Sequence, residues 1–489
     1  MTPEGIEPRL LINGKLVEAS DKKTFPLYNP TTREKIADVP EASEEDTNAA
    51  VAAAKAAFPS WSALSPIQRG QCFKKLADLI REAHDELAYL EAISMGQPVS
   101  RYHDSYWAAA EFDYYSEAWL RPQGTTSLHT PGFVNMTFRQ PYGVVAAIIP
   151  WNFPLGFFAK KTAPALMAGN TVVLKSSEKA PLTLHDQSAK VATLVEKAGF
   201  PPGVLNIISG HGPLSGAILS SHMDVRVVTF TGSVRTGRQI QMAAAKSNLK
   251  NVLLELGGKT PAVIFEDADL KKASEETRFS IQYNSGQVCM ANSRIYVQES
   301  IADRFISLFK EKFAAVRAGD PTNKDTNHGP LADEAQYTTV TNYIEEGKKT
   351  GTLLHGGNGG LQHLNGYFVE PTIFTNTPEN ARIVKEEIFG PVVVINTFKS
   401  EEEVIQKAND SEYGLYASVY TKNLDRAMRM AKAFEAGTVS INCASPSLAP
   451  DMPFGGYKAS GIGREGWICG LDNYLETKTV LMKVDSASQ

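Results

Sequence analysis

The stretch NSGQVCMANSR, from Asn284 to Arg294, contains one cysteine whose thiol could do covalent chemistry. Small and polar residues surround Cys289, and Gly286 would let a ligand approach the backbone closely. A free thiol has a pKa of about 8.5, so a nucleophilic cysteine usually needs a base, and no histidine lies in this stretch. Two interpretations stay open: Cys289 is a small buried hydrophobe, or a group elsewhere in the chain activates it.

Glycines that follow an apolar run mark a candidate phosphate site. In FTGSVRTG (residues 230–237), Gly232 and Ser233 stand where a strand would end and a helix begin. Backbone N–H groups at such a helix start attract a pyrophosphate. The motif is not a P-loop, because Arg238 stands where lysine should be, and a plain strand-to-helix turn is the alternative. GHGPLSG (residues 210–216) does not match the G-x-G-x-x-G motif.

Two charged residues follow the neighbouring apolar run VVLKSSE. Glu178 stands just past the expected strand end, where an acidic side chain can accept hydrogen bonds from the hydroxyls of an adenosine ribose. Lys175 could donate to the same ribose. A solvated salt bridge between the two residues is the alternative.

These groups lie at the ends of short apolar runs that are typical of buried strands in a parallel sheet. Helix-like stretches such as residues 181–199 alternate with the runs, which predicts an α/β fold with helices on both faces. Right-handed crossovers would make the sheet open and doubly wound, with ligands bound beyond the carboxyl ends of the strands. The runs are residues 144–150, 171–177, 204–210, 227–233 and 251–258.

The first third of the chain is expected to be helical after a short extended start. Ser43 and Asp46 have the spacing of a capping box, and Ser65 with Pro66 predicts a second helix start. Cys72 falls within that second helix and is interpreted as packing. In the C-terminal half, strand-like runs at 391–398 and 437–442 accompany a helical stretch at 423–436, which indicates a second α/β domain. The alternating, turn-rich residues 121–143 predict a hairpin that leaves the body.

Composition limits the classes of function. The chain has 489 residues, is 43% hydrophobic and carries a formal net charge of −5, so a nucleic-acid surface is not expected. It has no apolar run long enough to span a membrane, and no signal peptide, so we expect a cytoplasmic protein. The cysteines lie far apart without metal-ligand spacing, which predicts neither a metal site nor a disulfide scaffold; they are Cys72, Cys289, Cys443 and Cys469.

Six short motifs follow one another along nearly the whole chain. They are PWNFP (150–154), FTGS (230–233), LELGGK (254–259), GQVC (286–289), EEIFGPV (386–392) and PFGGYKASGIGREG (453–466). Each is weak alone, but the six in this order and spacing are highly specific. Together they resemble the NAD(P)-dependent aldehyde dehydrogenase superfamily.

The resemblance implies an answer for Cys289. In this family a glutamate at the position of Glu255 is the general base, and a partly desolvated carboxylate has a raised pKa that suits this role. Cys289 would attack the aldehyde, with Asn152 and the Cys289 backbone N–H stabilising the oxyanion. Hydride transfer would leave a thioester, which water activated by Glu255 would hydrolyse. Glu255 is expected to end a strand and Cys289 to lie on the first loop of the next domain.

The resemblance also implies the fold, the cofactor and the assembly. A Rossmann-type NAD-binding domain would comprise residues 1–122 and 142–257, and a second α/β catalytic domain residues 258–455. Residues 123–141 and 474–489 would form a β oligomerisation arm and its tail, paired between the subunits of a homodimer or homotetramer. NAD is expected as cofactor, with weaker use of NADP. The implied contacts to the cofactor are Ile149, Trp151, Lys175, Glu178, Gly232 and Ser233 for the adenosine and diphosphate, and Glu387 and Phe389 for the nicotinamide ribose.

The substrate is expected to be a small-molecule aldehyde, and medium or aromatic aldehydes are favoured over acetaldehyde if the aromatic-rich residues 104–120 line the tunnel. Lys160 departs from the family, which often has an aromatic residue at that position, so the tunnel is not expected to be purely hydrophobic. Either the Lys160 stem lines the wall and its ammonium reaches water, or the ammonium attracts an acidic substrate. The candidate tunnel residues are Trp107, Phe153, Phe157, Lys160, Tyr283, Leu448 and Phe454.

Three other functions are compatible with parts of the pattern. A CoA-acylating enzyme of the same superfamily would pass the thioester to CoA, although Glu255 favours water as acceptor. A thiol hydrolase or acyltransferase would use Cys289 without redox chemistry. A crystallin-like structural protein would be expected to have lost the nucleophile or the base, yet Cys289, Glu255 and Asn152 are all present.

Overall fold

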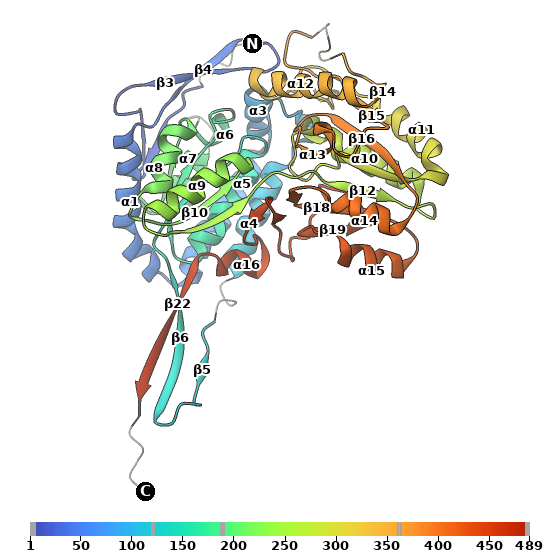
Figure 1. Ribbon diagram of the computed structural model, residues 1–489. Helices are drawn as coiled ribbons and strands as arrows, with labels where there is room; N and C mark the ends of the chain where they lie inside the picture. Colours follow the sequence, from blue (N-terminus) through green and yellow to red (C-terminus); the bar gives the residue numbers. More distant parts are fainter. Residues whose placement is uncertain (1–5, 119–122, 186–190, 359–360, 362–363, 485–489) are drawn as a thin grey trace.

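Two α/β bodies lie side by side, and a narrow β arm extends away from them (Figure 1). The structure, a computed structural model, describes residues 6–118, 123–185, 191–358, 361 and 364–484. Each body is built around one sheet, and the sequence-based expectation of a two-domain α/β fold with a β arm is confirmed.

The sheet of the first body has the order β2-β1-β9-β8-β7-β10-β11-β21. Its five central strands are parallel, and the chain moves outward from β7 in one direction through β8 and β9 and in the other through β10 and β11. The order therefore reverses between β7 and β10, where doubly wound sheets bind ligands. The strands are β1 (Leu10–Ile12), β2 (Lys15–Val17), β7 (Val144–Ile148), β8 (Thr171–Lys175), β9 (Leu205–Ile208), β10 (Val225–Thr231), β11 (Asn251–Glu255) and β21 (Gly461–Ile462).

Helices cover both faces of this sheet because alternate strand residues point to opposite sides. Val145 and Ala147 of β7 pack with α2, α4, α5 and α7, whereas Val144 and Ala146 pack with α1, α8 and α9. Both expected capping boxes are present, at Ser43 and Ser65. The helices of this body are α1 (Glu44–Ala63), α2 (Pro66–Glu82), α3 (His84–Met95), α4 (Asp104–Glu117), α5 (Pro154–Met167), α6 (Leu182–His185), α7 (Val191–Ala198), α8 (Ala217–Ser221), α9 (Val234–Lys246) and α16 (Trp467–Asp472).

The sheet of the second body has the order β14-β15-β16-β13-β12-β18-β19, and all its strands except edge strand β14 run parallel. Its strands are β12 (Pro261–Ile264), β13 (Arg294–Gln298), β14 (Thr352–His355), β15 (Thr372–Thr375), β16 (Val392–Phe398), β18 (Tyr416–Tyr420) and β19 (Thr438–Ile441). Its helices are α10 (Leu270–Gln282), α11 (Ala302–Phe313), α12 (Glu334–Thr350), α13 (Arg382–Lys385), α14 (Glu401–Asn409) and α15 (Leu424–Ala433). Two small ladders lie outside the two large sheets: β3 (Thr24–Tyr28) with β4 (Lys35–Pro40), and β17 (Tyr413–Gly414) with β20 (Tyr457–Lys458).

After the second sheet the chain returns to the first body. Strand β21 pairs antiparallel with β11, and helix α16 packs against α5. The sequence-based division assigned residues 456–473 to neither domain, and these contacts place β21 and α16 with the first body. The domain boundaries themselves stay a prediction.

The arm is a three-stranded sheet formed within one chain. Strand β6 (Phe133–Pro141) pairs with β5 (Thr126–Ser127) as the expected hairpin, and along its other edge it pairs with β22 (Leu475–Lys483). The prediction that arm and tail pair between subunits is therefore wrong for these strands, because β22 satisfies the edge of β6 in the same chain. Residues 121–122 and 485–489 of the predicted arm and tail lie outside the described residues. No helix among the described residues combines the length and apolar composition needed to cross a membrane.

Candidate active site

The switch point of the first sheet brings three predicted segments together. The residues that follow β7 include Ile149, Trp151 and Asn152, and those that follow neighbouring β10 include Gly232 and Ser233. Glu255 is the last residue of β11 and pairs in register with Thr231 of β10. Because parallel strands end at one edge of a sheet, these side chains meet in one crevice facing the second body.

Cys289 reaches this crevice from a strained loop of the second body. The loop connects α10 to β13, so the expectation that it would be the first loop of that domain is wrong: β12 and α10 precede it. Asn284, Ser285 and Gly286 all have positive φ, at 47°, 54° and 76°. A side chain at Gly286 would put its Cβ 2.2 Å from the carbonyl oxygen of Gly390, so this turn requires glycine.

The thiol and the carboxylate lie within contact distance. The Sγ of Cys289 donates to Oε1 of Glu255 over 3.7 Å, and Oγ1 of Thr231 donates to Oε2 of the same carboxylate over 3.2 Å. Thr231 thereby fixes the orientation of Glu255 toward the thiol. No histidine takes part in this pair, in agreement with the arrangement that the sequence resemblance implied.

Burial sets the protonation of both groups. Desolvation, reinforced by Glu255 and Glu387, raises the pKa of the Cys289 thiol well above its ordinary value. Desolvation, together with the nearby Glu465 carboxylate, raises the pKa of Glu255 to about 7. The resting thiol is therefore protonated, and Glu255 is a carboxyl group that can take up or release a proton near neutral pH.

Asn152 is held in place by one hydrogen bond from its side chain and one to its backbone. Its side-chain Nδ2 donates to the carbonyl oxygen of Gln287 over 3.0 Å, and its backbone oxygen accepts from Nδ2 of Asn284 over 3.1 Å. The Gln287 side chain is fixed in turn, because Oε1 accepts from the backbone N–H of Ala332. An amide nitrogen carries two protons, so the second Nδ2 proton of Asn152 is left for an oxygen in the crevice.

Sequence reasoning missed a buried ion pair behind Glu255. Nζ of Lys161 contacts Oε1 of Glu465, and both side chains are almost fully buried. Glu465 raises the pKa of Glu255 and Lys161 lowers it, so the two members of the pair act on this carboxyl group in opposite directions. Glu465 lies inside the quoted motif PFGGYKASGIGREG, but nothing in the sequence indicates that it meets a residue 304 positions earlier in the chain.

One side of Cys289 opens into an apolar cavity of about 390 Å³, within the usual size range of small-molecule sites. The structure brings all the predicted tunnel residues together in its wall. Val288, Met290 and the proline-rich segment from Pro446 to Pro453 add further apolar surface. The predicted residues that line it are Trp107, Phe153, Phe157, Lys160, Tyr283, Leu448 and Phe454.

The other side of Cys289 opens into a second cavity of about 260 Å³. The predicted cofactor residues in its wall are Trp151, Gly232, Ser233, Glu387 and Phe389, with Asn152 beside them. The rings of Trp151 and Phe389 meet edge to face at 5.4 Å, and Phe389 has a φ of +57°. Oε1 of Glu387 accepts the N–H of Gly258 over 3.1 Å. Cys289 therefore lies where two cavities meet.

The remaining predicted cofactor residues lie at the strand ends beyond this cavity. Lys175 ends β8, is buried, and donates from Nζ to the carbonyl oxygen of Ser176. Glu178 follows in the next turn and is partly exposed. Ile149 is buried and its backbone N–H donates to the Lys175 carbonyl oxygen. None of these three lines the cavity at Cys289.

The turn from β10 into α9 could hold the diphosphate of a dinucleotide. Ser233 caps α9, a helix of 13 residues, and its side chain is exposed at the helix start. The N–H of Gly232 already donates to the carbonyl oxygen of Glu255, so a diphosphate would be bound by Ser233 and the first turn of α9. A Cβ at Gly232 would lie 2.4 Å from the Phe230 ring, which explains the glycine.

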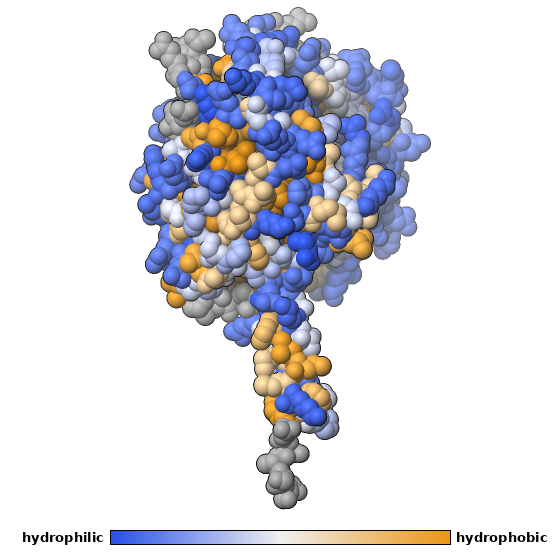
Figure 2. Space-filling view, turned by 90° about the vertical axis from the view of Figure 1, so that its left-hand side faces the viewer, coloured by the Kyte–Doolittle hydropathy of each residue, from blue (hydrophilic) through white to orange (hydrophobic). Residues whose placement is uncertain are grey.

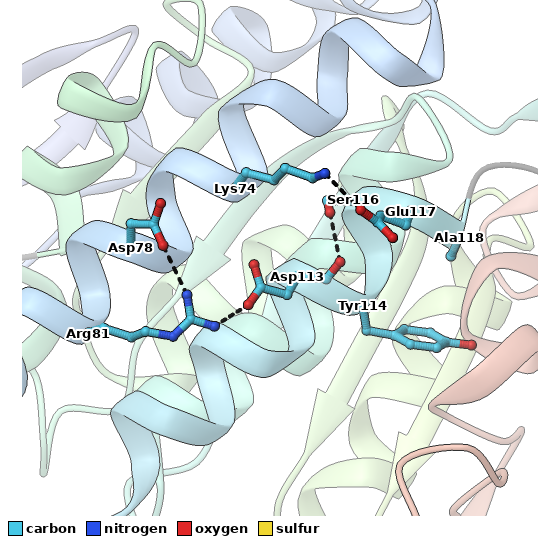
Figure 3. Close-up of a pocket in the computed structure, with 8 residues that line it drawn as sticks. All are labelled: Lys74, Asp78, Arg81, Asp113, Tyr114, Ser116, Glu117 and Ala118. Carbon is cyan, nitrogen blue, oxygen red and sulfur yellow. Dashed lines mark hydrogen bonds and ion pairs between the residues drawn. The ribbon is translucent and has the colours of Figure 1, made fainter.

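A larger hollow of about 790 Å³ lies between α2 and α4, but it lacks reactive groups (Figure 3). Its charged residues pair with one another: Arg81 pairs with Asp78 and Asp113, and Lys74 pairs with Glu117. The thiol and carboxylate of the crevice are not among its lining residues, so the two cavities beside Cys289 define the site.

A nucleotide-type crevice beside a buried thiol–carboxylate pair is the arrangement of a cofactor-dependent enzyme with covalent catalysis. The profile of the aldehyde dehydrogenase family matches residues 16–480. The chain belongs to the aldehyde dehydrogenase family, as its six motifs indicated.

Individual relatives match over nearly their full length. An aldehyde dehydrogenase of Alternaria alternata is 46% identical, covering 97% of this chain and 95% of that protein. The structure of an aldehyde dehydrogenase from Bacillus cereus in complex with NAD⁺ is 43% identical, with a TM-score of 0.95 and coverage of 99% and 98% of the two chains. A mutant indole-3-acetaldehyde dehydrogenase of P. syringae, in complex with NAD⁺ and IAA, is 40% identical, with a TM-score of 0.95 and the same coverage.

Proposed function

We propose that Cys289, Glu255 and Asn152 carry out the oxidation of an aldehyde to its carboxylic acid, with NAD as the cofactor. The observation that carries this assignment is the 3.7 Å contact between the Cys289 thiol and the Glu255 carboxylate where the two cavities meet. The aldehyde would enter from the apolar cavity and the cofactor from the other, so that the reacting carbon lies between them.

The first step forms a carbon–sulfur bond. Glu255 takes the thiol proton, the sulfur attacks the carbonyl carbon, and the carbonyl oxygen becomes an oxyanion. The second Nδ2 proton of Asn152 and the Cys289 backbone N–H donate to that oxygen, and one such donor is often worth ~3–4 kcal/mol. Bound NAD supplies the nicotinamide ring that accepts hydride from the carbon.

The second half releases the acid. Loss of hydride leaves a thioester on Cys289, which is attacked by water. Glu255 first releases the thiol proton to solvent and then removes a proton from that water. The carbon–sulfur bond breaks, and the proton taken from the water passes to the sulfur and regenerates the thiol. A base whose pKa lies at about 7 serves both the thiol and the water. Thr231 keeps the carboxylate in position throughout.

NAD is supported by the fold and by the relatives. Aldehyde dehydrogenases that share 40–43% of this sequence were solved as NAD⁺ complexes. In this chain, Ser233 at the start of α9 fits the diphosphate, and Glu178 and Lys175 fit the adenosine ribose. Glu387 and Phe389 fit the nicotinamide ribose beside Cys289.

The test is a panel of aldehydes with NAD, followed by NADH absorbance and product identification. We expect one carboxylic acid per NADH without added CoA, and no NADH from Cys289→Ala, which should still bind NAD. Cys72→Ala, Cys443→Ala and Cys469→Ala serve as matched controls that keep turnover. NADH formation by Cys289→Ala would remove the nucleophile assignment, and a requirement for CoA would make the enzyme CoA-acylating. Neither CoA acylation nor thiol hydrolysis is favoured by the relatives.

We further propose that the protein works in the cytoplasm as a homodimer or homotetramer assembled through its arm. Strand pairing puts Val134, Met136 and Phe138 of β6 on the same face as Val480 and Met482 of β22. This apolar arm face projects from the body, and Figure 2 shows the hydrophobic surface on the arm. Such a face is typical of an interface with another subunit. Relatives named cytosolic aldehyde dehydrogenases support the compartment.

A further inference from the structure

The apolar cavity beside Cys289 contains one buried ion pair. Lys160 of α5 and Glu111 of α4 both line the cavity, and Nζ of Lys160 lies 3.3 Å from Oε1 of Glu111. Their side chains keep 11% and 13% of their accessible surface. Nε1 of Trp107 donates to the same carboxylate oxygen over 3.3 Å. The two charges are thus fixed in the wall of the cavity and do not extend into bulk water.

Lys160 and Glu111 form an ion pair whose opposite charges cancel. Burial opposes the charge on Lys160, yet Glu111 and Glu465 outweigh burial and hold the pKa of Lys160 above its ordinary value. Asp104, the other acid in the wall, adds no charge, because burial raises its pKa to about 8. The cavity therefore presents a dipole to its ligand, with a donor and an acceptor side by side.

This chemistry distinguishes between aldehyde classes. A carboxylate on the substrate would approach Glu111 as well as Lys160, and an ammonium would approach Lys160 as well as Glu111, so each would meet a like charge in a desolvated site. A hydroxyl group meets neither penalty. It can accept from Nζ of Lys160 and donate to Oε2 of Glu111, which accepts no hydrogen bond from the described residues.

We propose that the Lys160–Glu111 pair selects aldehydes whose apolar, aromatic body carries a hydroxyl group. The aromatic wall residues Trp107, Phe153, Phe157 and Tyr283 cover the body while the pair binds the hydroxyl. This inference rests on the proposed function, because it concerns the substrate of the same site. It replaces both earlier interpretations of Lys160, since the ammonium neither reaches bulk water nor acts as a lone positive charge.

The experiment compares kcat/KM for aldehydes in which a methylene insulates the carbonyl from the ring substituent. The probes are phenylacetaldehyde, its 4-hydroxy and 4-methoxy derivatives, and derivatives with a 4-carboxylate or a 4-aminomethyl group. We expect the hydroxy compound to exceed the parent by about tenfold or more, since hydrogen bonds to charged groups discriminate at that level. The methoxy compound, which cannot donate to Glu111, should lose most of this advantage, and both ionic compounds should fall below the parent.

The double variant Lys160→Met/Glu111→Gln removes both charges without leaving one of them unpaired. It should reduce the hydroxy-to-parent ratio to within about threefold of unity. Lys74→Met/Glu117→Gln is the matched control, because this pair also joins α4 to a neighbouring helix but is exposed outside the cavity (Figure 3). The control should keep the wild-type ratio.

Every result of these kinetic measurements either supports the proposed selection of hydroxylated aldehydes or overturns it. A wild-type ratio below about twofold, a preference for an ionic aldehyde, or a ratio that survives in the double variant would each overturn the proposal. The wild-type panel does so even if the double variant fails to fold. Failure of the proposed function looks different: no member of the panel, including phenylacetaldehyde, would then give NADH.

Discussion

At the scale of single residues, a buried carboxyl group rather than a histidine lies against the Cys289 thiol. Glu255 stands at the end of a strand, where desolvation and Glu465 raise its pKa to about 7. Local motifs in the sequence predicted roles for Cys289, Glu255 and Asn152. The sequence could not identify Thr231 as the residue that orients Glu255, or Lys161 and Glu465 as its electrostatic neighbours, because contacts across the sheet leave no local signal.

Removing the base should slow turnover without preventing cofactor binding. Glu255→Gln keeps the shape of the side chain but cannot accept a proton, so we expect kcat to fall by ~10²–10⁴. Steady-state kinetics with one aldehyde measure this change. An unchanged rate would transfer the role of the base to another group.

The pH dependence should follow the same carboxyl group. The base acts only when deprotonated, and its pKa is raised to about 7, so kcat should fall as the pH drops through about 7 and reach a plateau above it. The residual activity of Glu255→Gln should lack this limb. One group titrates over ~2 pH units, so the fall in kcat should lie well within the range from pH 5 to pH 9. A wild-type profile that is flat across this range would contradict the assignment.

Cofactor choice should depend on Glu178. Its carboxylate would face the 2′-phosphate of NADP, and two unit charges ~4 Å apart repel by about 4 kcal/mol at an effective dielectric of ~20. Because solvent and Lys175 relieve part of this repulsion, we expect NAD to be preferred by roughly ten- to a thousandfold in kcat/KM. Glu178→Gln should lower the NAD-to-NADP ratio of kcat/KM, mainly by raising kcat/KM for NADP. If the ratio does not change, Glu178 does not set the preference.

At the scale of elements, the sheets and helix starts were predictable and the catalytic loop was not. Near-continuous apolar runs correctly predicted strands β7 to β11, and Ser43 and Ser65 correctly predicted two helix starts. The three successive positive φ values at Asn284, Ser285 and Gly286 accompany contacts to distant segments, which the sequence of the loop does not reveal. Asn284 donates to the Asn152 carbonyl oxygen, Ser285 donates to the Gly329 carbonyl oxygen, and Gly286 lies against Gly390.

That loop should be sensitive to a single methyl group. Gly286→Ala places a Cβ 2.2 Å from the Gly390 carbonyl oxygen at a φ of +76°, so Cys289 must move and both kcat and Tm should fall. Gly199→Ala is the control, because its φ of +87° is equally strained but nothing lies within 4 Å of the added Cβ. Calorimetry and kinetics on both variants separate backbone strain from displacement of the nucleophile. Equal kcat in the two variants would contradict the role of close packing.

At the scale of the whole molecule, the sequence predicted the arm and the tail as its partner strand, but it placed their pairing between subunits rather than within one chain. Alternation along β6 indicated a hairpin, whereas the pairing of β6 with β22 joins segments more than 300 residues apart. That pairing leaves the apolar arm face as the surface that a second subunit would cover.

Charges on the apolar arm face should dissociate the oligomer. Phe138→Glu with Met482→Glu would bury carboxylates in the proposed interface, which is costly without a partner charge. Leu481→Glu is the control, because Leu481 is 66% exposed and lies on the opposite face of the same strand. Light scattering should give the monomer mass for the double variant alone. A double variant of native mass would contradict assembly through this face.

The central claim is that the substrate becomes covalently attached to Cys289 and that Glu255 is needed to release it. Glu255→Gln, incubated with NAD and an aldehyde and then quenched in acid, should accumulate an acyl group whose mass is found by peptide mass spectrometry on the peptide containing Cys289. The wild type should show far less of this adduct at the same time point, and the double variant Cys289→Ala/Glu255→Gln none. An acyl group on Cys72, Cys443 or Cys469 instead, or NADH formation by the double variant, would contradict the account.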